Sequence, residues 1–261
     1  MEKKQENTFK KIIKHNKYTL ISVATVMVFL ALWELISFLL KKDFLLPRFS
    51  EVMKSLFTLF GKKEFYVVTG STLARCLVGF AISFVAGLGF GILAGISKTV
   101  RAIFAPLIAF LRTAPTMALT LIIMVCLRSK YTPILIGFIM VFPIIFRTIS
   151  DSLQNIDGKL KDMMKLYEVK SSYALKYMYI PEIAPVLFGS IVTAFGMNIK
   201  AVVSAEILAY TANSIGLKMF ISGQNFDAPT LFAWVLVALF LSALFEILLN
   251  FVQKLVCKKW N

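Results

Sequence analysis

The chain has few of the side chains that metal proteins and secreted scaffolds depend on. A single histidine, His15, and three cysteines, Cys76, Cys126 and Cys257, stand among 261 residues. The cysteines lie far apart, within or beside apolar runs, and form no C-x-x-C pair. This pattern excludes the usual metal clusters and a disulfide framework. We therefore expect small buried cysteines, no metal and no cofactor.

Charge is also scarce. Only 16% of the residues are charged and 58% are hydrophobic, with a mean hydropathy of +0.78. A soluble domain is usually about 25% charged and about 45–50% apolar, so an ordinary soluble enzyme and a disordered chain are excluded. A membrane-spanning helix needs roughly 20 apolar residues, and backbone groups in hydrocarbon must be satisfied within the segment. The composition predicts an all-α, polytopic membrane protein.

The apolar runs predict about six transmembrane helices. They cover roughly residues 18–40, 70–96, 104–127, 131–150, 184–209 and 229–252. Between the first and second runs, apolar residues at positions 49, 52, 53, 56, 57 and 60 follow the period of a helix. We expect the external part of segment 18–65 to be an amphipathic helix at the membrane interface.

Acidic residues are half as frequent as basic ones, 14 against 29. A basic excess is typical of proteins that bind nucleic acid or an anionic membrane surface. No soluble stretch is long enough for a nucleic-acid module, so we expect membrane lipid as a partner and no nucleic acid. More basic residues fall inside when the N-terminus is placed in the cytoplasm, including the tails 1–17 and 253–261. The bias predicts that both termini are cytoplasmic.

Small residues recur every fourth position in the second run. They are Gly79, Ser83, Gly87, Gly91 and Gly95. Such a stripe lets a neighbouring helix approach closely, within the chain or in a partner. No G-x-x-x-x-G-K-[ST] phosphate loop occurs in the sequence, so ATP is not bound by that route.

The longest inside loop, residues 151–185, is unusually apolar for a connector. Apolar residues alternate with lysines, which predicts two short amphipathic helices with a break near residues 170–172. Pro181 and Pro185 are expected to mark the return to the membrane. Exposed apolar residues on such a helix pair favour docking of another protein; a helix pair lying on the lipid surface is the alternative.

This loop resembles the coupling loop of ABC-transporter permeases. The family pattern is Glu-Ala-Ala, three residues, Gly, nine residues, and Ile-x-Leu-Pro. The chain matches it in register but with altered residues: Asp162, Met163, Met164, Glu168, Met178, Ile180 and Pro181. Glu168 stands where the family has the turn glycine, so it must avoid or tolerate a positive φ.

Other segments are similar to the same family. They are residues 71–75 before the small-residue stripe, 106–107 and 111–119, 142–144, 202–206 and 216–217. The resemblance covers residues 66–252 and implies a MetI-like permease core, nearest to the nitrate, sulfonate and taurine importers. It implies a non-catalytic subunit in the plasma or inner membrane. The implied partners are ABC ATPase subunits, an extracytoplasmic solute-binding protein and a second permease chain, in a homodimer or a close heterodimer.

Charged residues within the predicted spans are candidates for the transport pathway. Arg112 lies between Pro106 and Pro115, where we expect the helix to break. Lys200 shares a small, polar helix face with Ser204, whereas Glu206 projects about 120° away from Lys200. Lys200 has two interpretations, an ion pair, for example with Glu206 of a second subunit, or an anionic substrate.

Two other function classes compete with the importer permease. A membrane-embedded enzyme needs a cluster of His, Asp, Glu or Cys near one face, which the scattered acids do not provide. A self-contained channel or secondary transporter has no need of a docking loop and should show inverted repeats, which we do not find. The sequence does not identify the substrate, although Lys200 and Arg112 suit a small anion such as nitrate, bicarbonate or a sulfonate.

Overall fold

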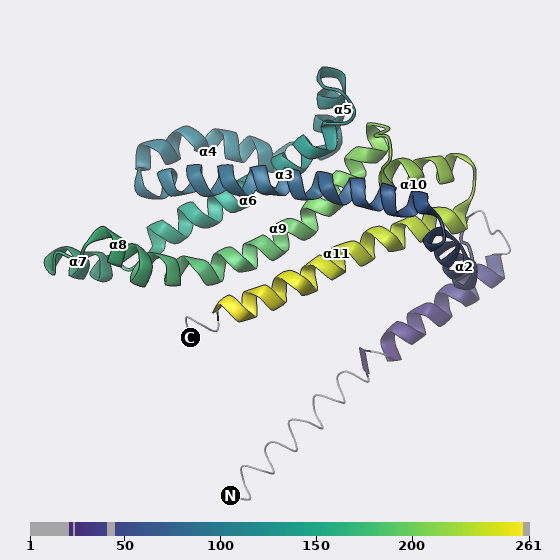
Figure 1. The fold of residues 1–261 in the computed structure, drawn as a ribbon, viewed down its shortest axis with the longest axis horizontal. Coiled ribbons are helices and arrows are strands. Elements are labelled where there is room, and N and C mark those ends of the chain that lie inside the picture. Colours follow the sequence, from purple (N-terminus) through teal and green to yellow (C-terminus); the bar gives the residue numbers. More distant parts are fainter. Residues whose placement is uncertain (1–20, 23, 41–44, 258–261) are drawn as a thin grey trace, which may run out of the picture.

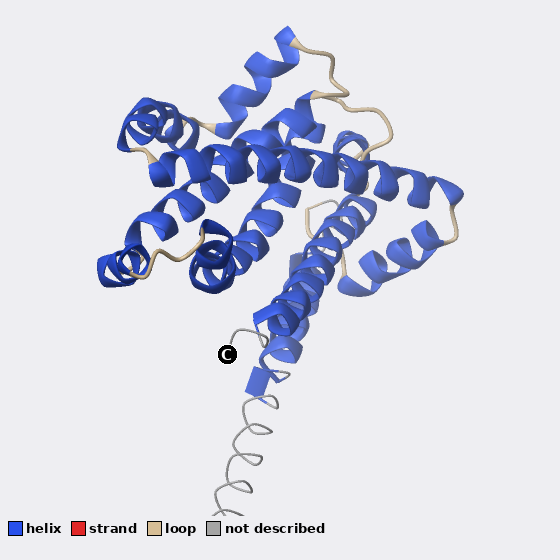
Figure 2. Ribbon diagram, turned by 60° about the vertical axis from the view of Figure 1, so that its left-hand side comes forward, coloured by secondary structure: helices blue, strands red, loops and turns tan. Residues whose placement is uncertain are grey.

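Every regular element of the described residues is a helix (Figures 1 and 2). The computed structural model describes residues 21–22, 24–40 and 45–257. A helix over Ala24–Leu40 comes first. It is followed by α2 Phe49–Phe60, α3 Lys63–Ile96, α4 Lys98–Thr113, α5 Thr116–Cys126, α6 Thr132–Asn155, α7 Gly158–Leu166, α8 Ser171–Ala174, the π-helix η1 Leu175–Tyr179, α9 Ile180–Leu208, α10 Ile215–Gln224 and α11 Ala228–Cys257.

The expected class, an all-α polytopic membrane protein, is confirmed. The expected number of six spans is not confirmed within the described residues. Four helices are long and apolar enough to cross a membrane: Lys63–Ile96, Thr132–Asn155, Ser172–Leu208 and Ala228–Leu255. The bent pair of α4 and α5 makes a fifth if it is counted as one span. The first expected span is described as the shorter apolar helix Ala24–Leu40, and its start lies outside the described residues.

The helices α3 and α6 pack closely because of the small-residue stripe. Gly79, Ser83, Gly87 and Gly91 are buried, and Gly95 is half-buried. A Cβ on Gly87 would lie 2.8 Å from Cβ of Ile145, and one on Gly91 would lie 2.9 Å from the carbonyl oxygen of Phe146. The Ser83 hydroxyl lies 3.3 Å from the carbonyl oxygen of Phe138 on α6. The stripe thus faces another helix of the same chain.

The expected span 104–127 is not one straight helix. It begins at Lys98, breaks at Ala114–Pro115, and the two helices are bent by 102°. A residue before proline avoids the helical region, and Ala114 is extended, with φ −64° and ψ 133°. Pro106 lies inside α4 without ending it. The break therefore follows the second proline, and it turns α5 away from the bundle (Figure 1).

The prolines of the long loop do not end a helix. After α7, residues 167–170 form the expected turn, but α8, η1 and α9 then continue as one helix from Ser172 to Leu208. The amide of Ile180 donates to the carbonyl of Leu175, five residues back, which widens the turn directly before Pro181. A widened π-turn accommodates a proline ring that would clash in a regular α-helix. Pro185 lies inside α9.

The amphipathic segment forms α2, and protein covers much of its apolar face. Val52 and Leu59 are buried in a cluster with Trp234 and Val237 of α11. The preceding helix Ala24–Leu40 reaches α2 through Glu34, whose carboxylate accepts the Phe49 amide hydrogen at 2.8 Å. In Figure 1, α2 and α10 lie at one end of the molecule, and α7 and α8 lie at the other.

Candidate functional site

A buried carboxylate lies where α3, α9 and α10 meet. Glu206 on α9 is fully buried, and its Oε1 accepts a hydrogen bond from Nη1 of Arg75 on α3 at 2.8 Å. Its Oε2 accepts from the Thr72 hydroxyl at 3.0 Å and from the Gly216 amide at 3.2 Å. Both carboxylate oxygens are therefore bonded within the chain.

The same network holds the segment between α9 and α10. Arg75 also donates from Nη2 to the carbonyl of Ala212 at 2.8 Å. The Thr72 hydroxyl accepts the Ile215 amide hydrogen at 3.0 Å. A Cβ on Gly216 would lie 2.7 Å from the carbonyl oxygen of Val203, so a glycine is needed for this close approach. Glu206 is thus a positioning residue here, and its charge partner is Arg75.

Lys200 and Ser204 lie on the accessible face of α9, with Thr193. Gly189 and Gly196, which the helical period places on the same face, are half-buried. Within the described chain no carboxylate forms an ion pair with Lys200. A lysine and small polar residues on the open face of a membrane-spanning helix are costly against lipid, so this face suits an aqueous pathway or a second subunit.

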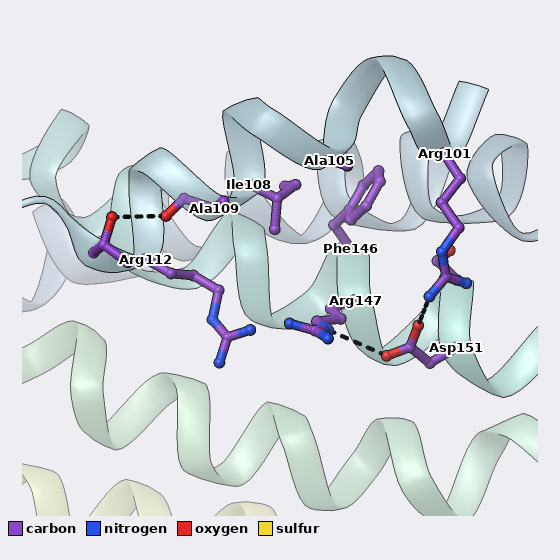
Figure 3. Close-up of a pocket in the computed structure, with 10 residues that line it drawn as sticks. Arg101, Ala105, Ile108, Ala109, Arg112, Phe146, Arg147 and Asp151 are labelled. Carbon is purple, nitrogen blue, oxygen red and sulfur yellow. Dashed lines mark hydrogen bonds and ion pairs between the residues drawn. The ribbon is translucent and has the colours of Figure 1, made fainter. Parts of the chain in front are cut away.

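A second charged cluster lies beside the helix break (Figure 3). Arg112, near the end of α4, lines a cavity of about 450 Å³ together with Arg101 and with Arg147 and Asp151 of α6. Asp151 bonds two of these arginines, Arg101 at 2.6 Å and Arg147 at 3.3 Å. Figure 3 shows the guanidinium groups of Arg112 and Arg147 pointing into the same space. Pro115, exposed at the bend, ends the helix that carries Arg112.

The contacts of Arg75, Arg101 and Arg147 were not predicted from the sequence. The partners of Arg75 and Arg101 lie 131 and 50 residues away in the chain, so no local sequence pattern predicts these contacts. The pair of Arg147 and Asp151 has the i, i+4 spacing of a helical ion pair, a signal that was available.

The segment with the coupling-loop pattern lies at the end of the bundle away from α2 and α10. Asp162, Met163 and Ile180 are exposed, Pro181 and Met164 are half-buried, and Met178 is buried against the inner helices. The neighbouring apolar residues Leu166 and Tyr167 are 78% and 73% exposed. Glu168 has a φ of 48°, the left-handed conformation that a glycine adopts most easily. The turn is therefore present without its glycine.

Residues 87–261 match the family model described as the binding-protein-dependent transport system inner membrane component. The chain belongs to this family. The matched residues include the C-terminal end of α3 from Gly87, the broken helix pair, α6, α9 and the exposed segment between them.

Three curated relatives indicate where the chain lies within this family. The nitrate import permease protein NrtB of Leptolyngbya laminosa is 31% identical over 67% of this chain and 64% of its own length. The bicarbonate transport system permease protein CmpB of Synechococcus elongatus is 27% identical over 61% and 57%. The taurine transport system permease protein TauC of Escherichia coli is 22% identical over 90% and 87%. The chain thus spans less than two thirds of the length of the first two.

The fold is similar to that of a solved transporter. A structure of the MetNI methionine ABC transporter in an inward-facing conformation superposes with a TM-score of 0.60 and 16% identity. The match covers 74% of this chain and 94% of the other. The MetI-like core expected from the sequence is therefore confirmed at the level of the fold.

Proposed function

We propose that this chain is the permease subunit of an ABC importer, non-catalytic by itself and driven by a partner ATPase. The observation that carries the proposal is the turn at Glu168, which has a left-handed φ at the position of the family glycine, thirteen residues before Pro181. The glycine of the family pattern allows a positive φ, and Glu168 has a positive φ although it is not a glycine. A left-handed residue after a helix is common, and the competing classes, an ATPase-independent transporter and a membrane enzyme, differ in giving no reason for its spacing from Pro181.

The proposed ATPase contact is the exposed segment from α7 to α9. Asp162, Met163, Glu168 and Ile180 face outward beside Leu166 and Tyr167, whereas Met164, Met178 and Pro181 join the segment to the bundle. Large exposed apolar side chains in a polar, lysine-rich segment are typical of a protein-docking surface. A movement of the docked ATPase would reach the pathway through the second half of the segment, because the helix that begins at Ser172 continues into α9 without a break.

The proposed pathway lies between two permease copies, along the accessible face of α9 and the bend of α4 and α5. Lys200, Ser204, Arg112 and Pro115 all lie on accessible surface there. The relatives named for nitrate, bicarbonate and taurine import suggest a small oxyanion or sulfonate as the solute, delivered by an extracytoplasmic binding protein. The basic inside segments support cytoplasmic termini in the plasma or inner membrane, with the α7–α8 end in the cytoplasm.

Copurification with a candidate ABC ATPase tests the proposal. The two proteins are coexpressed, and a tag on the permease is used to recover the complex in a mild detergent. We expect recovery of the ATPase, and at least a severalfold loss of it with the double variant Leu166→Ala, Tyr167→Ala. The matched control is Phe57→Ala, which removes an aromatic side chain 66% exposed on α2 at the other end of the bundle. Equal recovery with all three chains, or no ATPase with any, would contradict the proposal.

A further inference from the structure

The cavity beside the helix break contains an excess of positive charge. Its wall carries three arginines, Arg101, Arg112 and Arg147, against one carboxylate, Asp151. Asp151 is shared by Arg101 and Arg147, and within the described residues Arg112 has no ion-pair partner. Guanidinium groups that point into one space repel one another, so an arrangement of this kind is stabilised by an anion.

Two polar atoms in the wall of this cavity also lack partners. Nη1 of Arg101 and the hydroxyl of Ser150 are buried, and neither forms a hydrogen bond within the described part of the chain. Buried donors without an acceptor cost free energy, and they are uncommon in native proteins. Both atoms are closed to solvent, so an anion in the open cavity would reach them only after a movement of the cavity wall.

The position of the cavity excludes a purely structural surface cluster facing lipid. Arg101 is near the start of α4 and Arg112 lies eleven residues further on, which corresponds to about 16 Å along the helix. That is about half of the roughly 30 Å thickness of the hydrocarbon core. Arginines at such depths face water or protein rather than lipid. The three guanidinium groups therefore extend from the proposed cytoplasmic end of α4 toward the middle of the membrane.

A neighbouring cavity is less positive because an acidic residue, Glu182, lines it. A second cavity of about 480 Å³ shares Arg112, Arg147 and Asp151 and is also lined by Glu182 of α9. The carboxylate of Glu182 disfavours an anion there. The space between Arg101 and Arg112 is the more positive of the two. Its volume is within the range of roughly 300–1,000 Å³ typical of small-molecule sites.

We propose that Arg101, Arg112 and Arg147 form an oxyanion-binding site in the inner half of the pathway, and that its ligand is the transported solute. The planar fork of a guanidinium group matches the oxygens of a nitrate, bicarbonate or sulfonate. Asp151 holds two of the arginines in place and competes with the anion for them. The assignment of the ligand rests on the proposed function, whereas the binding site itself does not.

Equilibrium binding to the purified full-length chain tests the site. The probe is ³⁵S-labelled methanesulfonate, measured in detergent at constant ionic strength without any ATPase. We expect Arg112→Gln to weaken binding at least about tenfold, as the loss of a charge-assisted hydrogen bond predicts. Arg128→Gln is the matched control, because Arg128 is an exposed arginine outside the cavity, and it should leave binding unchanged.

A second variant separates a ligand site from a structural charge cluster. Asp151→Asn keeps a side-chain oxygen that can accept from Arg101 and Arg147 but removes the competing negative charge, so binding should become tighter by severalfold, in the direction opposite to Arg112→Gln. A structural cluster would be damaged by both changes. Weaker probe binding in both variants, or unchanged binding in Arg112→Gln, would overturn the site.

Competition identifies the source of the oxyanion. Displacement of the probe by nitrate or bicarbonate supports a transported solute as the ligand. Displacement by phosphatidylglycerol in mixed micelles, but not by these anions, overturns that assignment and identifies a lipid phosphate as the ligand. Probe binding requires no ATPase, and ATPase recovery requires no anion. A negative result for the anion site and a negative result for the proposed function can therefore be told apart.

Discussion

Arg75 on α3 and Glu206 on α9 form an ion pair of 2.8 Å, with the carboxylate fully buried and the arginine 12% exposed. The two residues are 131 positions apart in sequence, and the pair supports the segment before α10 through Ala212 and the start of α10 through Gly216. A buried charge is tolerated only when it is paired and hydrogen-bonded, so the partners depend strongly on each other.

Loss of Arg75 should therefore destabilise the bundle. We expect Arg75→Gln to lower the free energy of unfolding by about 3–5 kcal/mol, because it leaves a buried carboxylate without its counter-charge. The double variant Arg75→Gln, Glu206→Gln should be more stable than the single variant. The thermal midpoint of the purified chain in detergent measures both effects. A double variant as unstable as the sum of the two single changes would contradict this coupling.

The stripe on α3 offers a pair of matched glycine substitutions. Gly91→Ala should destabilise the chain because its Cβ would lie 2.9 Å from Cβ of Ile149 and from the carbonyl oxygen of Phe146. Gly89→Ala on the same helix has nothing within 4 Å of its Cβ, and it should gain about 1 kcal/mol of helix propensity. The two thermal midpoints should move in opposite directions. A shift of the same sign in both would show that α3 and α6 are not in close contact.

Glu168 provides a test of the left-handed turn. Replacing it with glycine should stabilise the turn by up to about 1 kcal/mol, because glycine adopts a positive φ without strain but loses more entropy on folding. Glu168→Val should act in the opposite direction, since a β-branched residue is poorly accommodated there. Amide hydrogen exchange over residues 158–180 reports the difference. Slower exchange in the valine variant than in the glycine variant would refute a positive φ at this position.

Lys200 should affect anion transport rather than folding. Its side chain is exposed on α9 and has no ion pair within the described residues, so Lys200→Ala should leave the thermal midpoint unchanged. In the reconstituted transporter it should reduce the uptake of anions severalfold, because the pathway loses a positive charge. Lys98→Ala, an exposed lysine at the start of α4, is the control. Normal anion uptake by a stable Lys200→Ala variant would remove Lys200 from the pathway.

The sequence predicted features that depend on neighbours along the chain. Apolar runs of membrane length predicted the long helices, and Pro115 predicted the break in the third span. The four-residue spacing of Gly79, Ser83, Gly87 and Gly91 predicted close helix packing, although it left open whether the neighbour belonged to the same chain. Motif spacing placed Glu168 at the position of the family's turn glycine, but it left open whether Glu168 adopts a positive φ, which the structure shows. These features are local because backbone dihedrals and helical faces follow from the residues themselves.

By itself, the sequence determined that this is a helical membrane protein with a packed small-residue face and a segment that resembles the coupling loop of its family. Only the tertiary structure decided that Glu206 meets Arg75 instead of Lys200, that Pro181 is accommodated by a π-turn, and that Arg101, Arg112 and Arg147 surround one cavity. The reason is physical. The partner of a charged side chain is set by the rotation and crossing of whole helices, and in this protein those depend on contacts between residues 50 to 131 positions apart.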